Sequence, residues 1–246
     1  MLEINKIYNE DCLEGMKKID DESIDCIICD LPYGTTKNSW DSVIPLNSLW
    51  TEYKRIIKPA GAIVLFAQTP FDKILGASNI EMLKYEWIWE KEAGTGFLNA
   101  NKMPLKIHEN VLVFYRDLPT YNPIMRKGFS PYTHFSKGGK TSTNYGEHHE
   151  YITKSNGERF PIDILFFPRD RDGFHPTQKP VDIIRYFIST YTDVGGVILD
   201  NCMGSGTTAI ACIKEKRHFI GFELNKEYFD KAVKRINAEK SQLLLF

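Results

Sequence analysis

The sequence has no apolar run near the roughly 20 residues that a helix needs to cross a bilayer, so it does not predict a membrane protein. Its first residues include Glu3 and Asn5 where a signal peptide would have an apolar segment, and we expect a cytoplasmic protein. A strong charge of either sign is also absent, because the formal net charge is −1. This balance excludes a polycation that binds nucleic acid through its overall charge, so any phosphate contact must come from a local patch.

Cysteine is sparse and odd in number, with five residues, which favours reduced thiols over a disulfide framework. Cys26 and Cys29 make a C-x-x-C spacing, but they lie in an apolar stretch, residues 24–29, that predicts a buried strand. Residues three apart on a strand point to opposite faces, so this pair cannot hold one zinc ion together. A second C-x-x-C is absent, and we predict no metal site.

The chain also lacks internal repeats and low-complexity tracts, and its 42% hydrophobic content is too high for a disordered protein. Strand-like and helix-like segments alternate, which predicts an α/β fold with one mostly parallel sheet covered by helices on both faces. The first clear helix should end at residues 58–61, where Pro59 and Gly61 stand. We expect strands at residues 4–8, 24–29, 62–66, 85–89, 111–115, 197–200 and 218–223, and helices at 45–57, 70–82, 183–191, 207–214 and from 226 onward.

Residues 117–174 differ from the rest, with many aromatic, glycine, proline and hydroxyl residues and little periodicity. Such a stretch is typical of an inserted, loop-rich module. It holds eight basic and seven acidic residues, so its charge alone does not identify a nucleic-acid surface.

A glycine-rich segment, Asp200-Asn201-Cys202-Met203-Gly204-Ser205-Gly206-Thr207, joins a predicted strand to a predicted helix. Glycine lets the backbone approach a ligand, and a helix N-terminus favours an anionic group. Glu223, at the end of the next strand, stands where an acidic residue takes ribose hydroxyls. Ala209 fills the place of the third glycine of G-x-G-x-x-G, which favours a nucleoside over a dinucleotide. A structural strand–turn–helix without a ligand is the alternative.

Two further segments carry candidate chemistry. Asp30-Leu31-Pro32-Tyr33 directly follows a buried strand, where ligands of open α/β sheets bind. Its carboxylate, carbonyl and ring can accept two hydrogen bonds from an exocyclic amino group and stack on the base, although a solvated turn has the same pattern. His175-Pro176-Thr177-Gln178-Lys179-Pro180 ends the insertion, and by itself it predicts only a helix start.

Together, the three segments resemble motifs of the amino-group DNA methyltransferases that use S-adenosylmethionine: D-P-P-Y, D-P-F-x-G-x-G-T-T and H-P-T-Q-K-P. The order of catalytic motif, insertion and cofactor motif resembles the circularly permuted β group. The resemblance covers nearly all of the chain outside residues 117–174. It implies a Rossmann-like methyltransferase sheet, circularly permuted, with residues 1–116 and 175–246 as the catalytic domain and 117–174 as a target-recognition region.

The resemblance also implies site residues. Asp30, Leu31, Pro32 and Tyr33 would be catalytic, with Asp30 and the Leu31 carbonyl binding the target amino group and Tyr33 stacking on a flipped base. Asp11 would hold the adenine amino group of the cofactor, although a helix N-cap is the alternative. The full set expected to bind S-adenosylmethionine is Asp11, Cys12, His175, Thr177, Lys179, Asp200, Gly204, Ser205, Gly206, Thr207 and Glu223, with His175, Thr177 and Lys179 at its amino-acid end.

The chain departs from the family pattern at two places. Leu31 replaces proline, which should be tolerated because the motif uses the backbone carbonyl there. Asn201 and Cys202 replace proline and phenylalanine, so another residue must supply the aromatic contact to the cofactor. By resemblance, aspartate at the first catalytic position favours adenine N6, and cytosine N4 is the alternative.

Double-stranded DNA is the partner that the resemblance implies. It leaves open a homodimer and a restriction endonuclease partner, and the apolar residues 243–246 could dock on a partner or pack on their own domain. RNA methylation, protein-glutamine methylation and a non-catalytic DNA-binding subunit are the competing functions. The motif order favours DNA, and the intact Asp30, Tyr33 and glycine turn argue against a non-catalytic role.

Overall fold

The computed structural model describes residues 2–34, 42–137, 139–140, 147–170 and 178–243. The chain divides into two compact units, Met1–Asn122 with Asp163–Phe246, and Pro123–Ile162. The first unit contains the central sheet.

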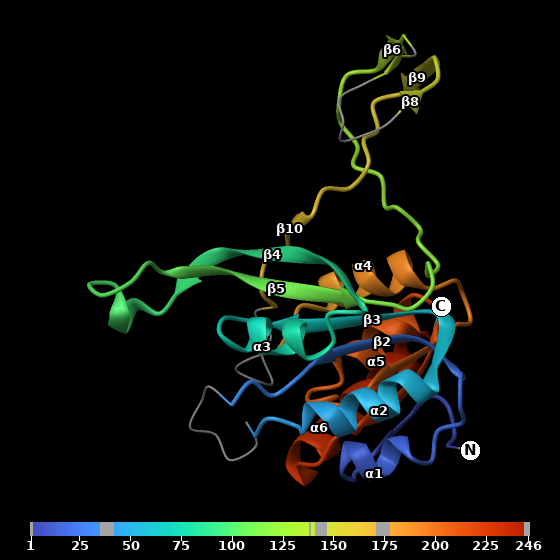
Figure 1. The fold of residues 1–246 in the computed structure, drawn as a ribbon. Coiled ribbons are helices and arrows are strands. Elements are labelled where there is room, and N and C mark those ends of the chain that lie inside the picture. Colours follow the sequence, from blue (N-terminus) through green and yellow to red (C-terminus); the bar gives the residue numbers. More distant parts are fainter. Residues whose placement is uncertain (1, 35–41, 138, 141–146, 171–177, 244–246) are drawn as a thin grey trace. The chain divides into compact units, whose positions relative to one another are not determined.

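An eight-stranded sheet forms the centre of the first unit, in the order β1-β12-β11-β2-β3-β5-β4-β10 (Figure 1). Every neighbouring pair is parallel except the two pairs that β5 makes, with β3 and with β4. The predicted α/β class with a mostly parallel sheet is confirmed. The strands are β1 (Lys6–Tyr8), β2 (Ile24–Asp30), β3 (Ile57–Ala67), β4 (Leu83–Thr95), β5 (Lys106–Phe114), β10 (Ile164–Phe166), β11 (Val197–Asp200) and β12 (His218–Phe222).

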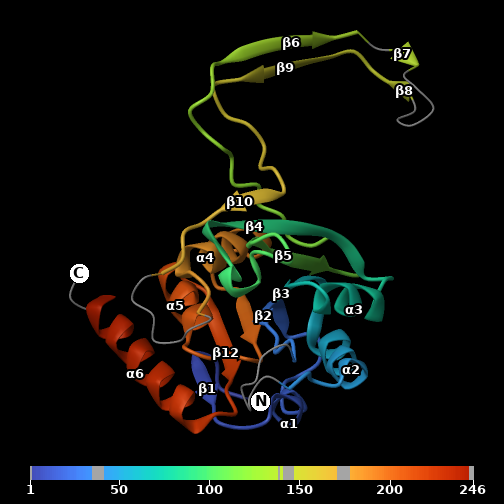
Figure 2. The same cartoon turned by 90° about the vertical axis from the view of Figure 1, so that its left-hand side faces the viewer.

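Helices cover both faces of this sheet, with α1, α2 and α3 on one side and α4, α5 and α6 on the other (Figure 2). They are α1 (Cys12–Met16), α2 (Leu46–Ile56), α3 (Phe71–Ser78), α4 (Val181–Tyr191), α5 (Thr207–Lys214) and α6 (Lys226–Leu243). Each face therefore has its own apolar core, and Cys29 lies in one core while Cys26 lies in the other. The opposite orientation of these two cysteines is confirmed. In the part of the chain that the structure describes, no helix is long and apolar enough to cross a membrane.

The segment at residues 58–61 corrects one sequence expectation. It was predicted to end the preceding helix, but β3 already begins at Ile57. Ile24 pairs with Ile57, and the next pair joins Cys26 to Ala62, so residues 58–61 form an irregularity within the strand. An ion pair of 2.6 Å between Lys58 Nζ and Asp25 Oδ1 crosses to the neighbouring strand. Proline and glycine here mark a bulge, which is the other structure that such residues allow in a strand.

The register places the ends of three parallel strands at one edge of the sheet. Asp30 ends β2 opposite Phe66, near the end of β3, and Asp200 ends β11 next to β2. Strands β4 and β5 continue beyond this edge, because Asn110 already pairs with Ala67 at the end of β3. In Figure 1 this pair of strands reaches well past the others.

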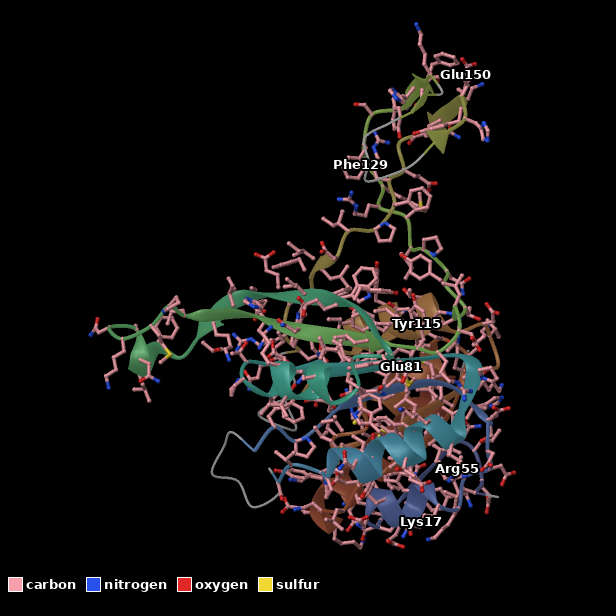
Figure 3. All side chains as sticks on the ribbon, in the orientation of Figure 1. Lys17, Arg55, Glu81, Tyr115, Phe129 and Glu150 are labelled. Carbon is pink, nitrogen blue, oxygen red and sulfur yellow. The ribbon has the colours of Figure 1, made fainter. Side chains whose placement is uncertain are left out.

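The second unit, residues 123–162, contains two antiparallel strand pairs: β6 (Tyr132–Ser136) with β9 (Tyr151–Ser155), and β7 (Gly139–Lys140) with β8 (Glu147–His148). Figure 3 shows Phe129 and Glu150 on it. It is shorter than the segment of unusual composition, residues 117–174, because β10 pairs with β4 in the first unit. The irregular run of glycines and aromatic residues predicted an insertion, but it did not predict at which residue the chain returns to the central sheet.

Candidate active site

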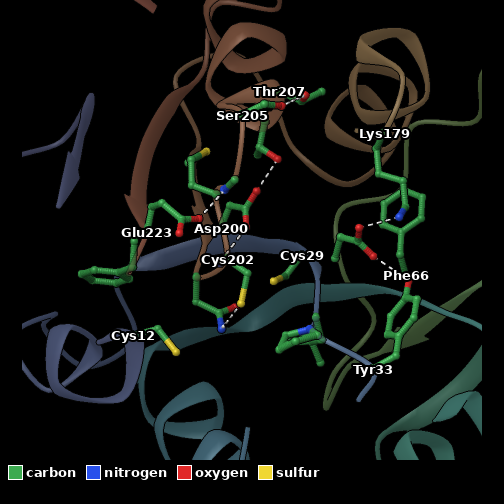
Figure 4. A pocket seen from close by; sticks show the side chains of 18 of the residues that line it. Cys12, Cys29, Tyr33, Phe66, Lys179, Asp200, Cys202, Ser205, Thr207 and Glu223 are labelled. Atoms are coloured by element: carbon green, nitrogen blue, oxygen red, sulfur yellow. Dashed lines mark hydrogen bonds and ion pairs between the residues drawn. The ribbon is translucent and has the colours of Figure 1, made fainter. Parts of the chain in front are cut away.

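A cavity of about 780 Å³ opens at the sheet edge where β2, β11 and β12 end. This volume is within the range of small-molecule sites. Tyr33, Phe66 and Lys179 stand on one side of it, and Asp200 and Glu223 on the other (Figure 4). The predicted site residues that line it are Asp11, Cys12, Asp30, Leu31, Pro32, Tyr33, Lys179, Asp200, Gly204, Ser205, Thr207 and Glu223.

Asp30 is held by two donors. Its Oδ2 accepts from Lys179 Nζ at 2.5 Å, and its Oδ1 accepts from Tyr33 Oη at 2.5 Å. Lys179 is 8% exposed and lies 5.4 Å from the centroid of the Phe66 ring. Because a carboxylate oxygen can accept more than one hydrogen bond, Asp30 is fixed in place and can still accept from a ligand.

The ion pair of Asp30 and Lys179 extends into a buried network that the sequence did not reveal. Lys179 Nζ also lies 3.3 Å from Glu109 Oε2, and Glu109 Oε1 accepts from Lys91 Nζ. The side chains of Lys179, Glu109 and Lys91 are all buried. Two ammonium groups and two carboxylates thus compensate each other, as buried charges require.

The pKa values in this network move according to burial and pairing. Burial raises the pKa of the Asp30 carboxyl above its ordinary value, and the nearby Lys179 ammonium opposes that rise. Burial would lower the pKa of Lys179, but the carboxylates of Asp30 and Glu109 outweigh it, so this pKa is raised. Burial likewise opposes ionisation of Glu109, but Lys179 and Lys91 lower its pKa. Lys179 therefore stays positively charged beside Asp30.

Asp200, at the end of β11, has neutral partners instead. Its Oδ2 accepts from Thr208 Oγ1 at 2.5 Å, and its Oδ1 accepts from the Cys202 backbone N–H at 3.0 Å. Burial raises the pKa of Asp200 to about 6, although these two hydrogen bonds oppose the rise. Among the residues that the structure describes, no cation forms an ion pair with Asp200, and burial without such a partner disfavours the charged form of a carboxyl.

The glycine turn has the backbone that its sequence predicts. Gly204 and Gly206 have φ values of +52° and +81°, in the left-handed region that favours glycine. A Cβ at Gly206 would come within 3.3 Å of Ala232 Cβ on α6. Glycine at this position therefore allows both the turn and the close packing of helix α6.

Glu223 connects this turn to β12. Its Oε2 accepts from the Gly204 N–H at 2.8 Å and its Oε1 from the Asn225 N–H at 2.7 Å. Burial raises the pKa of Glu223, and the two backbone donors oppose the rise. The side chain is thereby oriented in the cavity wall beside the exposed Leu224.

Comparison with known proteins decides the family. Residues 24–234 match the family model N6_N4_Mtase, described as DNA methylase. The chain belongs to this N6/N4 DNA methylase family. Members of the family use S-adenosylmethionine as the methyl donor, and DNA is the substrate of this methylase.

Individual relatives match over most of their length. The type II methyltransferase M1.MboII of Moraxella bovis is 27% identical over 94% of this methylase and 96% of its own length. DNA adenine methyltransferase YhdJ of Escherichia coli K12 is 27% identical over 96% of this chain and 83% of its own length.

Solved structures show the same fold. The cytosine-N4-specific PvuII DNA methyltransferase has a TM-score of 0.68 at 16% identity, over 97% of this chain and 92% of its own. The complex of M1.HpyAVI with S-adenosylmethionine has a TM-score of 0.64 at 24% identity, over 94% of this chain and 98% of its own.

The cavity of the methylase fits its cofactor by size and by chemistry. Carboxylates at Asp200 and Glu223, the glycine turn and apolar walls all face one space. Cys202 stands where the family has phenylalanine, but the aromatic side chains of Phe222 and Tyr228 line the same cavity. Either ring is a candidate for the aromatic contact that the sequence lacks at Cys202.

Some of the predicted site residues have other roles in the structure, and two of them lie outside the residues that the structure describes. Asp11 is the N-cap of α1, where its Oδ1 accepts from the Leu13 and Glu14 N–H groups at 2.9 and 3.2 Å. The N-cap alternative is thus observed, and Asp11 also lines the cavity, so its contact with the cofactor stays a prediction. Gly206 shapes the turn without lining the cavity. His175 and Thr177 lie outside the described residues.

Proposed function

We propose that this methylase transfers the methyl group of S-adenosylmethionine to N6 of a flipped adenine at a specific site in double-stranded DNA. The observation that carries the proposal is the fixed Asp30 carboxylate, next to the Leu31 carbonyl, in the same cavity as Asp200 and Glu223. The name of the E. coli relative, an adenine methyltransferase, supports adenine. Cytosine N4 is the second candidate, because the PvuII enzyme shares the fold.

Asp30 and Leu31 would activate the target nitrogen. The lone pair of an exocyclic amino group is delocalised into the ring, which makes it a poor nucleophile. When the Asp30 carboxylate and the Leu31 carbonyl each accept one N–H, the lone pair localises and the growing positive charge on nitrogen is stabilised. These contacts strengthen in the transition state, which is the condition for acceleration. S-Adenosylmethionine supplies the methyl group as an electrophile on sulfur.

Lys179 would act as a positioning residue for Asp30. Its ammonium holds Oδ2 of the carboxylate, while Tyr33 holds Oδ1. This fixed geometry supports in-line approach of base and methyl group. Our sequence prediction placed Lys179 at the amino-acid end of the cofactor, and that role remains a prediction beside the observed contact.

Tyr33 would also stack on the flipped base. Its ring is half-buried and stacks on Phe71, with ring centroids 5.3 Å apart and planes 30° apart. A base on the cavity side would extend this stack, and stacking on an aromatic side chain is worth about 1–3 kcal/mol.

The second unit would read the DNA sequence, as part of the target-recognition region 117–174. Its β6–β9 pair is a two-stranded ribbon, an element that the major groove accommodates. Tyr132, Phe135, Tyr151 and Ile152 on the ribbon are exposed, as is Lys154. The names of the type II methyltransferase relatives support a role beside a restriction endonuclease. A homodimer stays a prediction.

Nucleoside analysis tests the chemistry. The chain is incubated with isotope-labelled S-adenosylmethionine and unmethylated double-stranded DNA, and in parallel reactions with RNA and with protein, and the digested products are separated by mass. We expect labelled N6-methyladenine, and none with Asp30→Ala. Labelled N4-methylcytosine would overturn the choice of base, whereas unlabelled DNA beside labelled RNA or protein would overturn the proposal.

Deletion tests the recognition unit. Residues 123–162 are replaced by a short Gly/Ser linker, and a thermal melt confirms folding. We expect unchanged cofactor binding and loss of sequence-specific DNA binding. If the shortened protein still methylates the same sequence context, recognition lies elsewhere.

A further inference from the structure

The segment that joins β4 to β5 is apolar and exposed. It contains the short 3-10 helix η1 (Phe97–Asn99). Phe97 is 71% exposed, Leu98 is 99% exposed and Met103 is 58% exposed. Side chains at this tip stand away from the ribbon in Figure 3. Large apolar side chains gathered at one exposed tip are typical of a binding surface.

This tip, residues 96–105, belongs to the active-site edge of the sheet. Lys91 and Thr95 of β4 and Glu109 of β5 line the catalytic cavity, just before and after the tip. Lys106 Nζ donates to Gln68 Oε1 at 3.1 Å, and Gln68 lines the same cavity. The base of the hairpin is therefore part of the cavity wall, and its tip extends beyond the ends of β2 and β3.

The tip is preformed. Gly96 has a φ of +93°, and backbone hydrogen bonds close the turn: Asn99 N–H to Gly96 O at 2.9 Å, Lys102 N–H to Asn99 O at 2.8 Å and Met103 N–H to Asn99 O at 3.0 Å. Because this tip is already ordered, it would lose little conformational entropy when it binds a partner.

The charge of the tip suits a polyanion. Residues 94–108 include Lys102 and Lys106 and contain no acidic residue. Two cations beside three exposed apolar side chains match a DNA helix at the point where a base has left the stack: the cations face phosphates, and the apolar side chains face the exposed base planes.

We propose that this tip enters the DNA helix at the target base pair, where Leu98 and Phe97 fill the space that the flipped base vacates. The proposal rests on the proposed function, because it requires a base in the cavity. Unstacking and unpairing a base costs free energy in duplex DNA, and it costs less where the base is already unpaired. The wedge lowers that cost, so its contribution depends on whether the target base is paired.

The test compares Leu98→Ala with Ile80→Ala. Ile80 is 70% exposed, lies three residues before Leu83 at the other end of β4 and does not line the cavity, so it is a matched control. Each variant methylates two oligonucleotides, an ordinary duplex and one with an abasic site opposite the target base. We expect Leu98→Ala to lower kcat/KM about tenfold or more on the ordinary duplex and less than about threefold on the abasic one. Ile80→Ala should match the wild type on both.

Fluorescence of 2-aminopurine at the target position gives a second readout, with a weaker increase expected for Leu98→Ala. Equal losses on the two oligonucleotides, or no difference from Ile80→Ala, would overturn the wedge. A change in sedimentation for Leu98→Ala without a duplex-specific loss would assign the tip to self-association and also overturn it. If the wild type methylates neither oligonucleotide, the proposed function fails instead.

Discussion

Asp30 and Asp200 occupy equivalent places, as the last residues of two neighbouring parallel strands, yet their surroundings differ in kind. Asp30 is paired with an ammonium and belongs to a buried network of four charges. Asp200 is held by a hydroxyl and a backbone N–H. The comparison shows that the topology supplies two carboxylates at one cavity, while their partners decide how each behaves.

The partners also suggest different tasks. The Lys179 ammonium holds the Asp30 carboxylate in one position. That position would be kept while positive charge develops on the target nitrogen and is then lost. Asp200 has a pKa of about 6 and neutral hydrogen-bond partners. A cationic group of a ligand beside it would stabilise its ionised form. We therefore propose that Asp30 binds the target base and that Asp200 lies at the methionine end of the cofactor.

The largest effect is expected from Glu109→Gln. It leaves Lys91 and Lys179 with only the Asp30 carboxylate between them, and breaking a buried ion pair costs about 3–5 kcal/mol. Chemical denaturation should show a loss of that order, and Lys91→Met combined with Glu109→Gln should recover much of it. If the double variant is as unstable as the sum of both single variants, the pair does not interact as described.

Asp200→Asn should change the pH dependence of stability. The folded carboxyl holds its proton up to about pH 6, whereas the unfolded one releases it near pH 3.9. Folded Asp200 therefore binds more protons in this window, so its contribution to the free energy of unfolding falls as pH rises, by about 3 kcal/mol. The difference between wild type and Asp200→Asn should show that fall between about pH 4 and pH 6, and a flat difference would refute the shifted pKa.

Lys179→Met removes the cation from Asp30 but leaves Glu109 paired with Lys91. The Lys179 ammonium opposes the rise that burial causes in the Asp30 pKa, so without it this pKa is still higher and the carboxyl is more easily protonated. We expect methyl transfer to fall by about 10²-fold at neutral pH and to recover partly as pH rises. A pH profile parallel to that of the wild type would remove Lys179 from this role.

The smallest effect is expected from Glu223→Gln. It replaces one ionised acceptor oxygen by an amide, and a hydrogen bond to a charged group contributes about 1.5–3 kcal/mol. Calorimetry should show weaker binding of S-adenosylmethionine, with methyl transfer at saturating cofactor little changed. An unchanged Kd would place the ribose elsewhere.

Local sequence signals predicted the parts of the site that depend on backbone. The glycine turn at Gly204 and Gly206 requires left-handed φ values, and Asp30 is the last residue of a strand that the apolar residues 26–29 indicate clearly. Both features are encoded within a few residues, so a pattern can find them.

The buried network could not be predicted in the same way. Lys91 and Glu109 share a strand face with the buried Trp89 and Val111, but charged side chains are rarely buried unless they are paired, and no local pattern shows their partners. Their burial depends on α4 and Lys179 approaching from far along the chain. Similarly, residues 58–61 have the composition of a helix end, and only the pairing of β2 with β3 turns them into a bulge.

Single-turnover transfer by Asp30→Asn tests the central claim most directly. The variant keeps the size of the side chain, and the wild type and the variant are loaded with saturating labelled S-adenosylmethionine before DNA is added. The account predicts full cofactor occupancy in both and methyl transfer in the wild type alone. Transfer by Asp30→Asn at the wild-type rate would contradict the assignment of Asp30 to the target base.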